Sequence, residues 1–487
     1  MKKIVITIII AIASISTTFA QNEMDALRYS QIYYGGTARS TAMCGAFGAL
    51  GADFSSLSQN PAGIGLYKIS EFTFTPSFYK GKTTSNYMGS PDRDNYKYNI
   101  NLGNLGFIYT FFKRGNYVQD AGFKSAQFGF GINRMNNFNN RMTMEGYNPF
   151  SSMMNQYAID AEGKNSNNLG SFDTRLAYDA YLINPKITDS THYTSVVNGN
   201  VTQRKSVTTS GSMNEVVMSL GGNYNDKLYI GATLGFPFIH YSEQSTYKEI
   251  DTKDSTANFN SFTVSDDIKT SGAGINLKFG LIYRPIDLIR IGLAFHSPTY
   301  YYSMQDEYSR RIESDLVQGK YKFDSPKGSY EYELTTPLRL IGSLAFVIGE
   351  HGLISADYEF IDYTEPRLTN AENSEAFFKT NDAIQEKYQP TSNLRIGTEW
   401  RLNPLALRAG YALYGSPFKS DVNDGKRTTI SFGLGFREKQ FFIDLTYAYS
   451  KQDEDYYFYD PSVITSLSPV KNSMTGSNIM MTIGFKY

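Results

Sequence analysis

Histidine, the usual general base in nucleophilic catalysis, is sparse in this chain. The four histidines are His192, His240, His296 and His351. His296 directly precedes Ser297, but neighbouring residues of a strand point to opposite faces, so they do not form a catalytic pair. No group of His, Cys and Asp has the spacing of a metal site. The sequence therefore predicts a protein that is not an enzyme and that uses no metal or cofactor.

Cysteine content and net charge argue against two further kinds of site. Cys44 is the only cysteine, so it can form neither an internal disulfide nor a thiolate metal cluster. The 46 Lys and Arg residues nearly balance the 47 Asp and Glu residues, and no basic stripe runs along the chain. Nucleic acid is therefore excluded as a partner.

The remaining charges lie in segments that alternate with a period of two. In residues 478–487, Ile479, Ile483 and Phe485 share one face, and Lys486 lies on the other. Such alternation is typical of a strand with one apolar face. It recurs at 274–283, 289–296, 338–348, 394–401, 430–437 and 441–450.

About fourteen such segments are present, an even number, as expected of a bacterial outer-membrane barrel. They run nearer ten residues than the five or six of a sandwich strand, which is long enough to cross a bilayer when tilted. Short turns such as 225–226 alternate with long loops such as 453–473. The pattern predicts an all-β, transmembrane antiparallel barrel. The predicted strands are 69–83, 97–113, 123–138, 212–225, 227–244, 268–284, 288–302, 331–348, 352–364, 391–402, 404–414, 427–438, 440–452 and 474–487.

The N-terminal region precedes the alternating segments and has two parts. Lys2 and Lys3 lead into an uncharged apolar run at 4–15, and small residues follow at 18 and 20. This predicts a cleaved signal peptide at 1–20 and export to the bacterial outer membrane. Residues 21–68 do not alternate and have too few large apolar side chains for a core of their own. Because a fourteen-strand lumen is wider than side chains can fill, we expect this segment to be a hatch that plugs the barrel of residues 69–487.

Two motifs in the predicted hatch resemble the FadL/TodX family of outer-membrane transporters of hydrophobic compounds. Residues 36–47 read GTARSTAMCGAF, and residues 60–63 read NPAG. Segments 292–298 and 407–411 are similar to later strands of that family. The resemblance covers nearly all of the chain after the signal peptide, and the two N-terminal motifs are its specific part.

The resemblance implies passive uptake of long-chain fatty acids or other apolar small molecules. Solute would enter an apolar groove among the outer loops, reach a pocket in the lumen and leave sideways through a kink in the third strand. Asn60, Pro61, Ala62 and Gly63 would form the hatch motif.

The other candidate site residues lie on the predicted strands of the barrel, and the charged ones among them are expected to point inward. Candidate kink positions, which ordinary strand flexibility explains equally well, are Gly129, Gly131, Asn136 and Asn137. Candidate anchors for a solute carboxylate, which could instead pair across the lumen or with the hatch, are Arg290, Arg339, Arg395 and Arg408.

Two other functions remain open at this point. A haem-binding receptor would use exposed His or Tyr, and the loops are rich in Tyr but the chain has four His. A structural or adhesive barrel would have no apolar pocket in its lumen. The expected partners are outer-membrane lipids, a hydrophobic solute and the barrel assembly machinery, and the protein is expected to be a monomer. The long loop 139–211, with Met142, Met144, Met153 and Met154, is expected to be functional or disordered.

Overall fold

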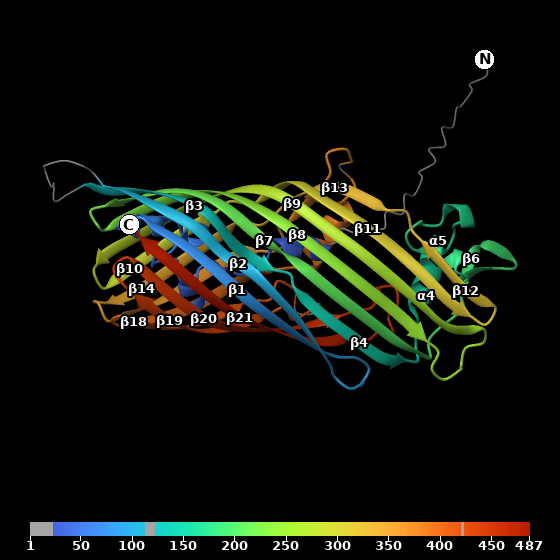
Figure 1. Cartoon of the computed structure of the whole chain (residues 1–487). Coiled ribbons are helices and arrows are strands. Elements are labelled where there is room, and N and C mark those ends of the chain that lie inside the picture. Colours follow the sequence, from blue (N-terminus) through green and yellow to red (C-terminus); the bar gives the residue numbers. More distant parts are fainter. Residues whose placement is uncertain (1–22, 113–121, 374, 420–422) are drawn as a thin grey trace, which may run out of the picture.

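The computed structural model describes residues 23–112, 122–373, 375–419 and 423–487, and it shows a closed antiparallel barrel of 14 strands (Figure 1). β1 pairs with both β2 and β21, so the sheet closes on itself. Ten strands run without a break: β1 (Glu71–Asn86), β2 (Arg93–Phe112), β7 (Val201–Tyr224), β8 (Leu228–Ile250), β9 (Phe259–Ile286), β17 (Pro390–Leu402), β18 (Leu405–Tyr414), β19 (Arg427–Arg437), β20 (Phe441–Tyr456) and β21 (Val470–Lys486).

The other four strands are interrupted once or twice. They are β3 (Phe123–Asn137) with β4 (Asn140–Asn148), β10 (Ile289–His296) with β11 (Tyr300–Leu316), β12 (Gly319–Asp324) with β13 (Gly328–Thr335) and β14 (Arg339–Ile348), and β15 (Gly352–Asp362) with β16 (Arg367–Thr369). Each of the fourteen predicted strands overlaps one of these, so the predicted fold class is confirmed.

An apolar belt surrounds the outside of the barrel. On β9, Ile275, Leu277 and Phe279 are exposed, whereas the intervening Asn276 and Lys278 are buried inside. Apolar side chains continue along the outer face of β9 from Ala273 to Tyr283, which matches the roughly 9–11 residues that a tilted strand needs to cross a bilayer. Apolar residues outside and polar residues inside are the pattern of a membrane-spanning barrel. None of the described helices is long and apolar enough to span a membrane.

On one side of the barrel the strands continue well beyond the belt. β7 and β8 stay paired as far as Thr202 and Ile250. The chain between β4 and β7, residues 149–200, folds against this extension and is here called the external domain (Figure 1). It contains α4 (Met153–Ala161), η2 (Ser166–Asn168), α5 (Thr174–Asp179), β5 (Ile183–Lys186) and β6 (Asp189–Ser195).

The prediction of a loop over residues 139–211 was wrong at both ends of that range. β4 and β7 form a ladder from Asn140–Thr209 to Asn148–Val201. The alternation was missed because this ladder lies beyond the belt, where the outer face carries residues such as Arg141 and Arg204 instead of apolar ones. The middle of the loop is a folded domain and is not disordered. The predicted signal peptide 1–20 lies outside the described residues.

Candidate functional site

The hatch fills the lumen at the level of the belt (Figure 1). It consists of α1 (Glu23–Ser30), α2 (Ala38–Ala42), α3 (Ser56–Gln59) and η1 (Pro61–Leu66), joined by turns. Every residue from 36 to 50 is buried although few of them are large and apolar. The barrel wall therefore supplies the contacts that the hatch cannot make with itself.

Glycines on the inner face of the wall bring the strands into direct contact with the hatch. A Cβ atom on Gly129 would lie 2.6 Å from Cδ2 of Leu57, and one on Gly280 would lie 2.0 Å from Oδ1 of Asn60. Only glycine fits at such distances. A Cβ atom would also come within 3 Å of hatch atoms at Gly106, Gly131, Gly221, Gly231, Gly292, Gly397 and Gly410.

The NPAG segment joins the two halves of the hatch to each other and to the wall. Nδ2 of Asn60 donates to the carbonyl of Gly48 at 2.6 Å and to that of Leu281 in β9 at 3.3 Å. Its Oδ1 accepts the backbone N–H of Ala62 at 3.1 Å, which caps η1, and Pro61 opens that helix. Asn60 therefore holds the hatch together and binds it to β9. A role of Asn60 in gating stays a prediction.

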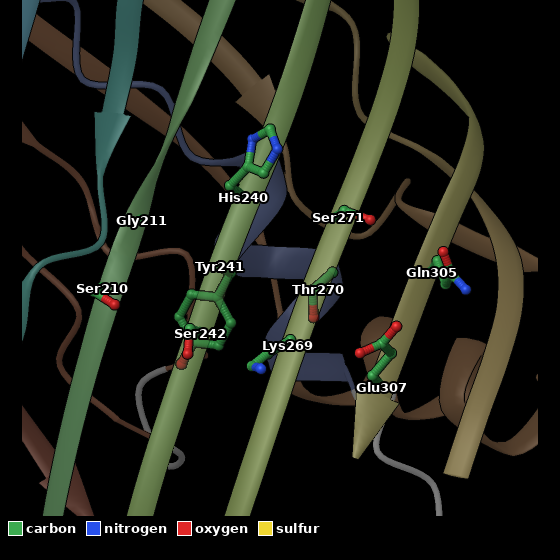
Figure 2. A pocket seen from close by; sticks show the side chains of 10 residues that line it. All are labelled: Ser210, Gly211, His240, Tyr241, Ser242, Lys269, Thr270, Ser271, Gln305 and Glu307. Carbon is green, nitrogen blue, oxygen red and sulfur yellow. The ribbon is translucent and has the colours of Figure 1, made fainter. Parts of the chain in front are cut away.

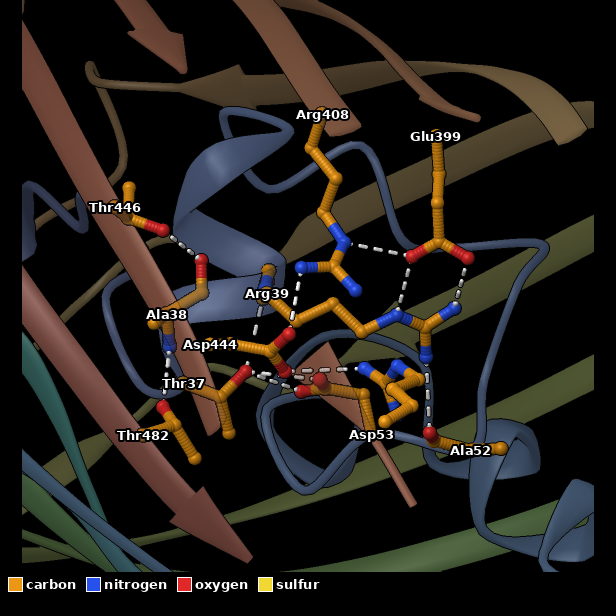
Figure 3. A network of polar contacts seen from close by, with 12 residues as sticks. Thr37, Ala38, Arg39, Ala52, Asp53, Glu399, Arg408, Asp444, Thr446 and Thr482 are labelled. Atoms are coloured by element: carbon orange, nitrogen blue, oxygen red, sulfur yellow. Dashed lines mark hydrogen bonds and ion pairs between the residues drawn. The ribbon is translucent and has the colours of Figure 1, made fainter. Parts of the chain in front are cut away.

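A buried charge network fastens α2 to the opposite side of the barrel (Figure 3). Arg39 donates to Glu399 through Nε at 2.8 Å and through Nη2 at 3.3 Å. Arg408 bridges Glu399 and Asp444 at 2.7 Å each. Glu399 and Asp444 are almost fully buried, so their charges depend on these guanidinium partners.

The four predicted carboxylate anchors all contact protein groups. Arg408 belongs to the network just described. Arg339 and Arg395 both bind Glu359, at 3.0 Å and 2.6 Å. Nη1 of Arg290 donates to the carbonyl of Leu50 in the hatch at 3.0 Å. These contacts agree with the alternative interpretation, in which inward charges pair across the lumen and with the hatch. A role of these arginines in holding solute stays a prediction.

A cavity of about 130 Å³ lies in the lumen between the hatch and the external end of the barrel. Four tyrosines, Tyr33, Tyr34, Tyr79 and Tyr414, contribute to its wall. Two arginines also line the cavity. None of the four histidines is among the described residues that line it, so of the two residue types that a haem receptor would use only tyrosine is present.

Arg134 and Arg427 are the two cations in this cavity. The guanidinium of Arg427 lies 3.9 Å from the ring centre of Tyr33, and its Nη2 donates to Oγ of Ser450 at 3.2 Å. The Nε atom of each arginine is buried without a hydrogen-bond partner. Within the described part of the chain, neither forms an ion pair with a carboxylate. The cavity therefore holds cationic groups with unused hydrogen-bonding capacity.

Beside the cavity the barrel wall is incomplete. β3 pairs with β2 only as far as Asn133 and Asn104, and the part of β2 before Asn104 pairs with β1 alone. β3 shifts register against β7 after Arg134 and stops at Asn137. Asn101 on one side of this gap and Asn136 on the other both line the cavity.

The four predicted kink positions fall in two places. Gly129 and Gly131 lie in regular ladder and face the hatch, where they accommodate Leu57 and Phe54. Asn136 and Asn137 lie at the irregular end of β3 and line the cavity. Whether the irregularity opens during transport stays a prediction.

The external domain is fastened by one buried carboxylate at the far end of β8. Glu249 accepts from Oγ of Ser152 at 2.6 Å, from the backbone N–H of Met153 at 2.9 Å and from Nε2 of Gln203 at 3.1 Å. Burial raises the pKa of the Glu249 carboxyl above its usual range, and these hydrogen bonds oppose that shift in part. In the described ranges, no group of three or more His, Cys, Asp and Glu residues is arranged to hold a metal.

Solved structures with the same architecture are outer-membrane channels. The toluene transporter TodX of P. putida superposes with a TM-score of 0.54 at 14% identity, over 93% of this chain and 99% of that one. A FadL homologue of Pseudomonas aeruginosa gives 0.54 at 11% identity, over 94% and 99%. The chain has the FadL/TodX fold. At this identity the likeness concerns the fold alone; no protein-family model and no curated protein matches the sequence.

Sequence reasoning missed Arg134 and Arg427 for identifiable reasons. Strict alternation along β3 puts Arg134 with the exposed Phe130, on the face toward lipid. A charge at such a position is itself a signal that the register changes, as it does after Arg134. Arg427 is the first residue of β19, ahead of the alternating segment from which inward charges were chosen.

Proposed function

We propose that this protein is a passive outer-membrane channel for a small apolar solute that carries one acidic group, such as a long-chain fatty acid. The unpaired Arg134 and Arg427 in the luminal cavity carry this proposal. A carboxylate taken out of water needs charged donors, and a guanidinium is the strongest available. The tyrosine walls would take the first part of the acyl chain, at roughly 0.8 kcal/mol per buried methylene.

The proposed route begins at the external end and leaves through the wall. The hatch meets the strands closely at its own level, so a straight path to the periplasm would require it to move. The gap between β2 and β3, with Asn101 and Asn136 on its two sides, adjoins the cavity without any such movement. Sideways exit into the bilayer suits an apolar solute. The cleaved signal peptide, the monomeric state and assembly by the barrel machinery belong to the same proposal.

The two arginines also distinguish this proposal from transport of a neutral aromatic hydrocarbon. An aromatic hydrocarbon can offer a guanidinium a cation–π contact but no hydrogen bond, so the unused Nε donors would stay buried without a partner, which costs free energy. TodX is a toluene transporter. The cavity described here favours an acid instead.

Uptake of labelled oleate by cells lacking their own fatty-acid transporter tests the proposal. Expression of the chain should speed uptake, and replacement of both cavity arginines by Gln should reduce the gain roughly a hundredfold, because each replacement loses a hydrogen bond to a charged group that is worth about tenfold. Arg141→Gln, on the outer face of β4, is the matched control and should behave like the unaltered protein. Equal uptake with and without the assembled barrel would overturn the proposal of a channel. Equal uptake by the double variant and the unaltered protein would overturn the proposal that the arginines bind the acidic group of the solute.

A further inference from the structure

A second cavity lies on the outside of the barrel, away from the solute route. It is a hollow of about 390 Å³ across β7, β8, β9 and β11, here called the outer hollow (Figure 2). The side chains that face outward into it are polar and come from neighbouring strands at the same height. They are His240, Ser242, Lys269, Ser271, Gln305 and Glu307.

The outer hollow begins where the apolar belt ends. Along the outer face of β9 the sequence passes from Ile275 and Ala273 to Ser271 and Lys269. On β11 it passes from Tyr300 and Tyr302, both exposed, to Gln305 and Glu307. Tyrosines at this height mark the boundary between the acyl chains and the headgroups. The outer hollow is therefore at the depth of the lipid headgroups in the leaflet next to the long loops.

A bend that runs across four strands shapes the outer hollow. Gly211 in β7 has a φ of +125°, and a Cβ atom there would lie 2.0 Å from the carbonyl oxygen of His240. The ladder between β8 and β9 is interrupted between Gly235 and Phe238, and β11 shifts register after Tyr301. Because these irregularities belong to the backbone, the concavity exists before anything binds.

The floor of the outer hollow is held from inside the lumen. The ring of Tyr241 faces inward, where the guanidinium of Arg28 lies 4.3 Å from its centre and the ring of Phe138 lies 5.7 Å away. In Figure 2 the N-terminal segment passes directly behind these strands. A floor packed in this way cannot collapse to close the hollow.

The charges at the rim remain available for a ligand. Lys269 and Glu307 are direct cross-strand neighbours, yet in the part of the chain that the structure describes neither takes part in an ion pair. Lys269, His240 and the serine hydroxyls can donate to a phosphate. Glu307 and Gln305 can accept from sugar hydroxyls. This mixture suits a phosphorylated sugar better than phosphate alone, which Glu307 would repel.

We propose that the outer hollow binds the phosphorylated sugar headgroup of a glycolipid in the outer leaflet, with the acyl chains along Ile275 and Tyr302 below it. The position at the end of the belt selects a lipid over a soluble sugar phosphate. The proposal rests on the placement of the barrel in an outer membrane, and it does not depend on which solute is carried.

Native mass spectrometry of the full-length protein in detergent, with added bisphosphorylated lipid A, tests this site. Lys269→Gln should weaken lipid A binding roughly tenfold, through loss of a charged hydrogen bond. Lys248→Gln is the matched control, because Lys248 lies on the outer face of the neighbouring strand but farther from the belt. Its binding should equal that of the unaltered protein.

Two further probes separate the lipid from its parts. The unaltered protein should bind lipid A without phosphates as weakly as Lys269→Gln binds intact lipid A. Lys269→Gln should bind the lipid without phosphates no more weakly than the unaltered protein does. Inorganic phosphate should not displace lipid A at comparable concentrations. Equal binding by Lys269→Gln, equal binding of the dephosphorylated lipid, or displacement by phosphate would each overturn the proposal. Failure of oleate uptake would overturn the transport proposal and leave this one standing.

Discussion

The hatch and the external domain both pack against the inner face of the barrel strands, but charged and apolar contacts contribute to the two in different proportions. Charges hold the hatch to the wall, with Arg39 bound to Glu399 as the centre of the network. The external domain has an apolar core in which Met154, Leu176 and Ile312 are buried together. The difference follows from the wall that each one meets: the lumen at membrane depth is polar, whereas the strand extensions turn apolar side chains inward. The hatch also buries Leu57 against Ile108 and Val217 of the wall, so its ion pairs add to a limited apolar contact.

The largest expected difference between the two regions is in the conductance of the barrel after each region is removed. Deletion of residues 21–66 should change the barrel from closed to open in planar-bilayer recordings, because the hatch fills the lumen. Replacement of residues 149–200 by Asn-Gly should leave it closed. That replacement is geometrically simple, since Asn148 and Val201 are paired and a two-residue turn can join them. Unchanged conductance after the first deletion would contradict the assignment of the hatch.

The charge network gives the next largest effect. Glu399→Ala leaves Arg39 and Arg408 with one buried carboxylate fewer, and breaking such a network costs about 3–5 kcal/mol. Cys44, buried in the hatch and the only cysteine, is a built-in probe. Its labelling by a maleimide should become faster as the hatch loosens. Glu350→Ala, in an exposed turn, is the control and should label slowly. Slow labelling of both variants would show that the network does not hold the hatch.

The two regions also differ in how far the sequence predicts them. The strands inside the belt could be predicted because lipid requires one apolar face, and the hatch because its small residues and NPAG segment cannot fold alone. The external domain could not, because beyond the belt no rule fixes the outer face: Arg141 and Arg204 stand where lipid would require apolar residues. Arg134 was missed for a related reason: it stands at a register shift, where strict alternation no longer gives the face of a residue.

The core of the external domain should respond as a separate folding unit. Met154 is fully buried in it, so Met154→Ala should destabilise the domain by roughly 2–5 kcal/mol, which is typical of a cavity left in a core. Limited proteolysis should then cut within 149–200 while the barrel keeps its heat-modifiable mobility and its low conductance. Ile187→Ala changes a fully exposed position of the same domain, and the protease should cut this variant no faster than the unaltered protein. An effect of Met154→Ala on conductance would show that the two regions are coupled.

The smallest effect concerns Glu249, the buried carboxylate of β8 that fastens the external domain. Burial raises the pKa of Glu249 in the folded domain, so the folded state holds this proton more tightly than the unfolded state does. The resulting stabilisation is full below the ordinary Glu pKa, and it is lost as pH rises from there through the raised value. Glu249→Gln, which keeps the shape and cannot ionise, should flatten this dependence and change stability at neutral pH by about 1 kcal/mol or less. Proteolysis rates between acidic and neutral pH measure it, with the exposed Glu162→Gln as control. If Glu249→Gln keeps the slope of the unaltered protein, the buried carboxylate is not what makes the external domain sensitive to pH.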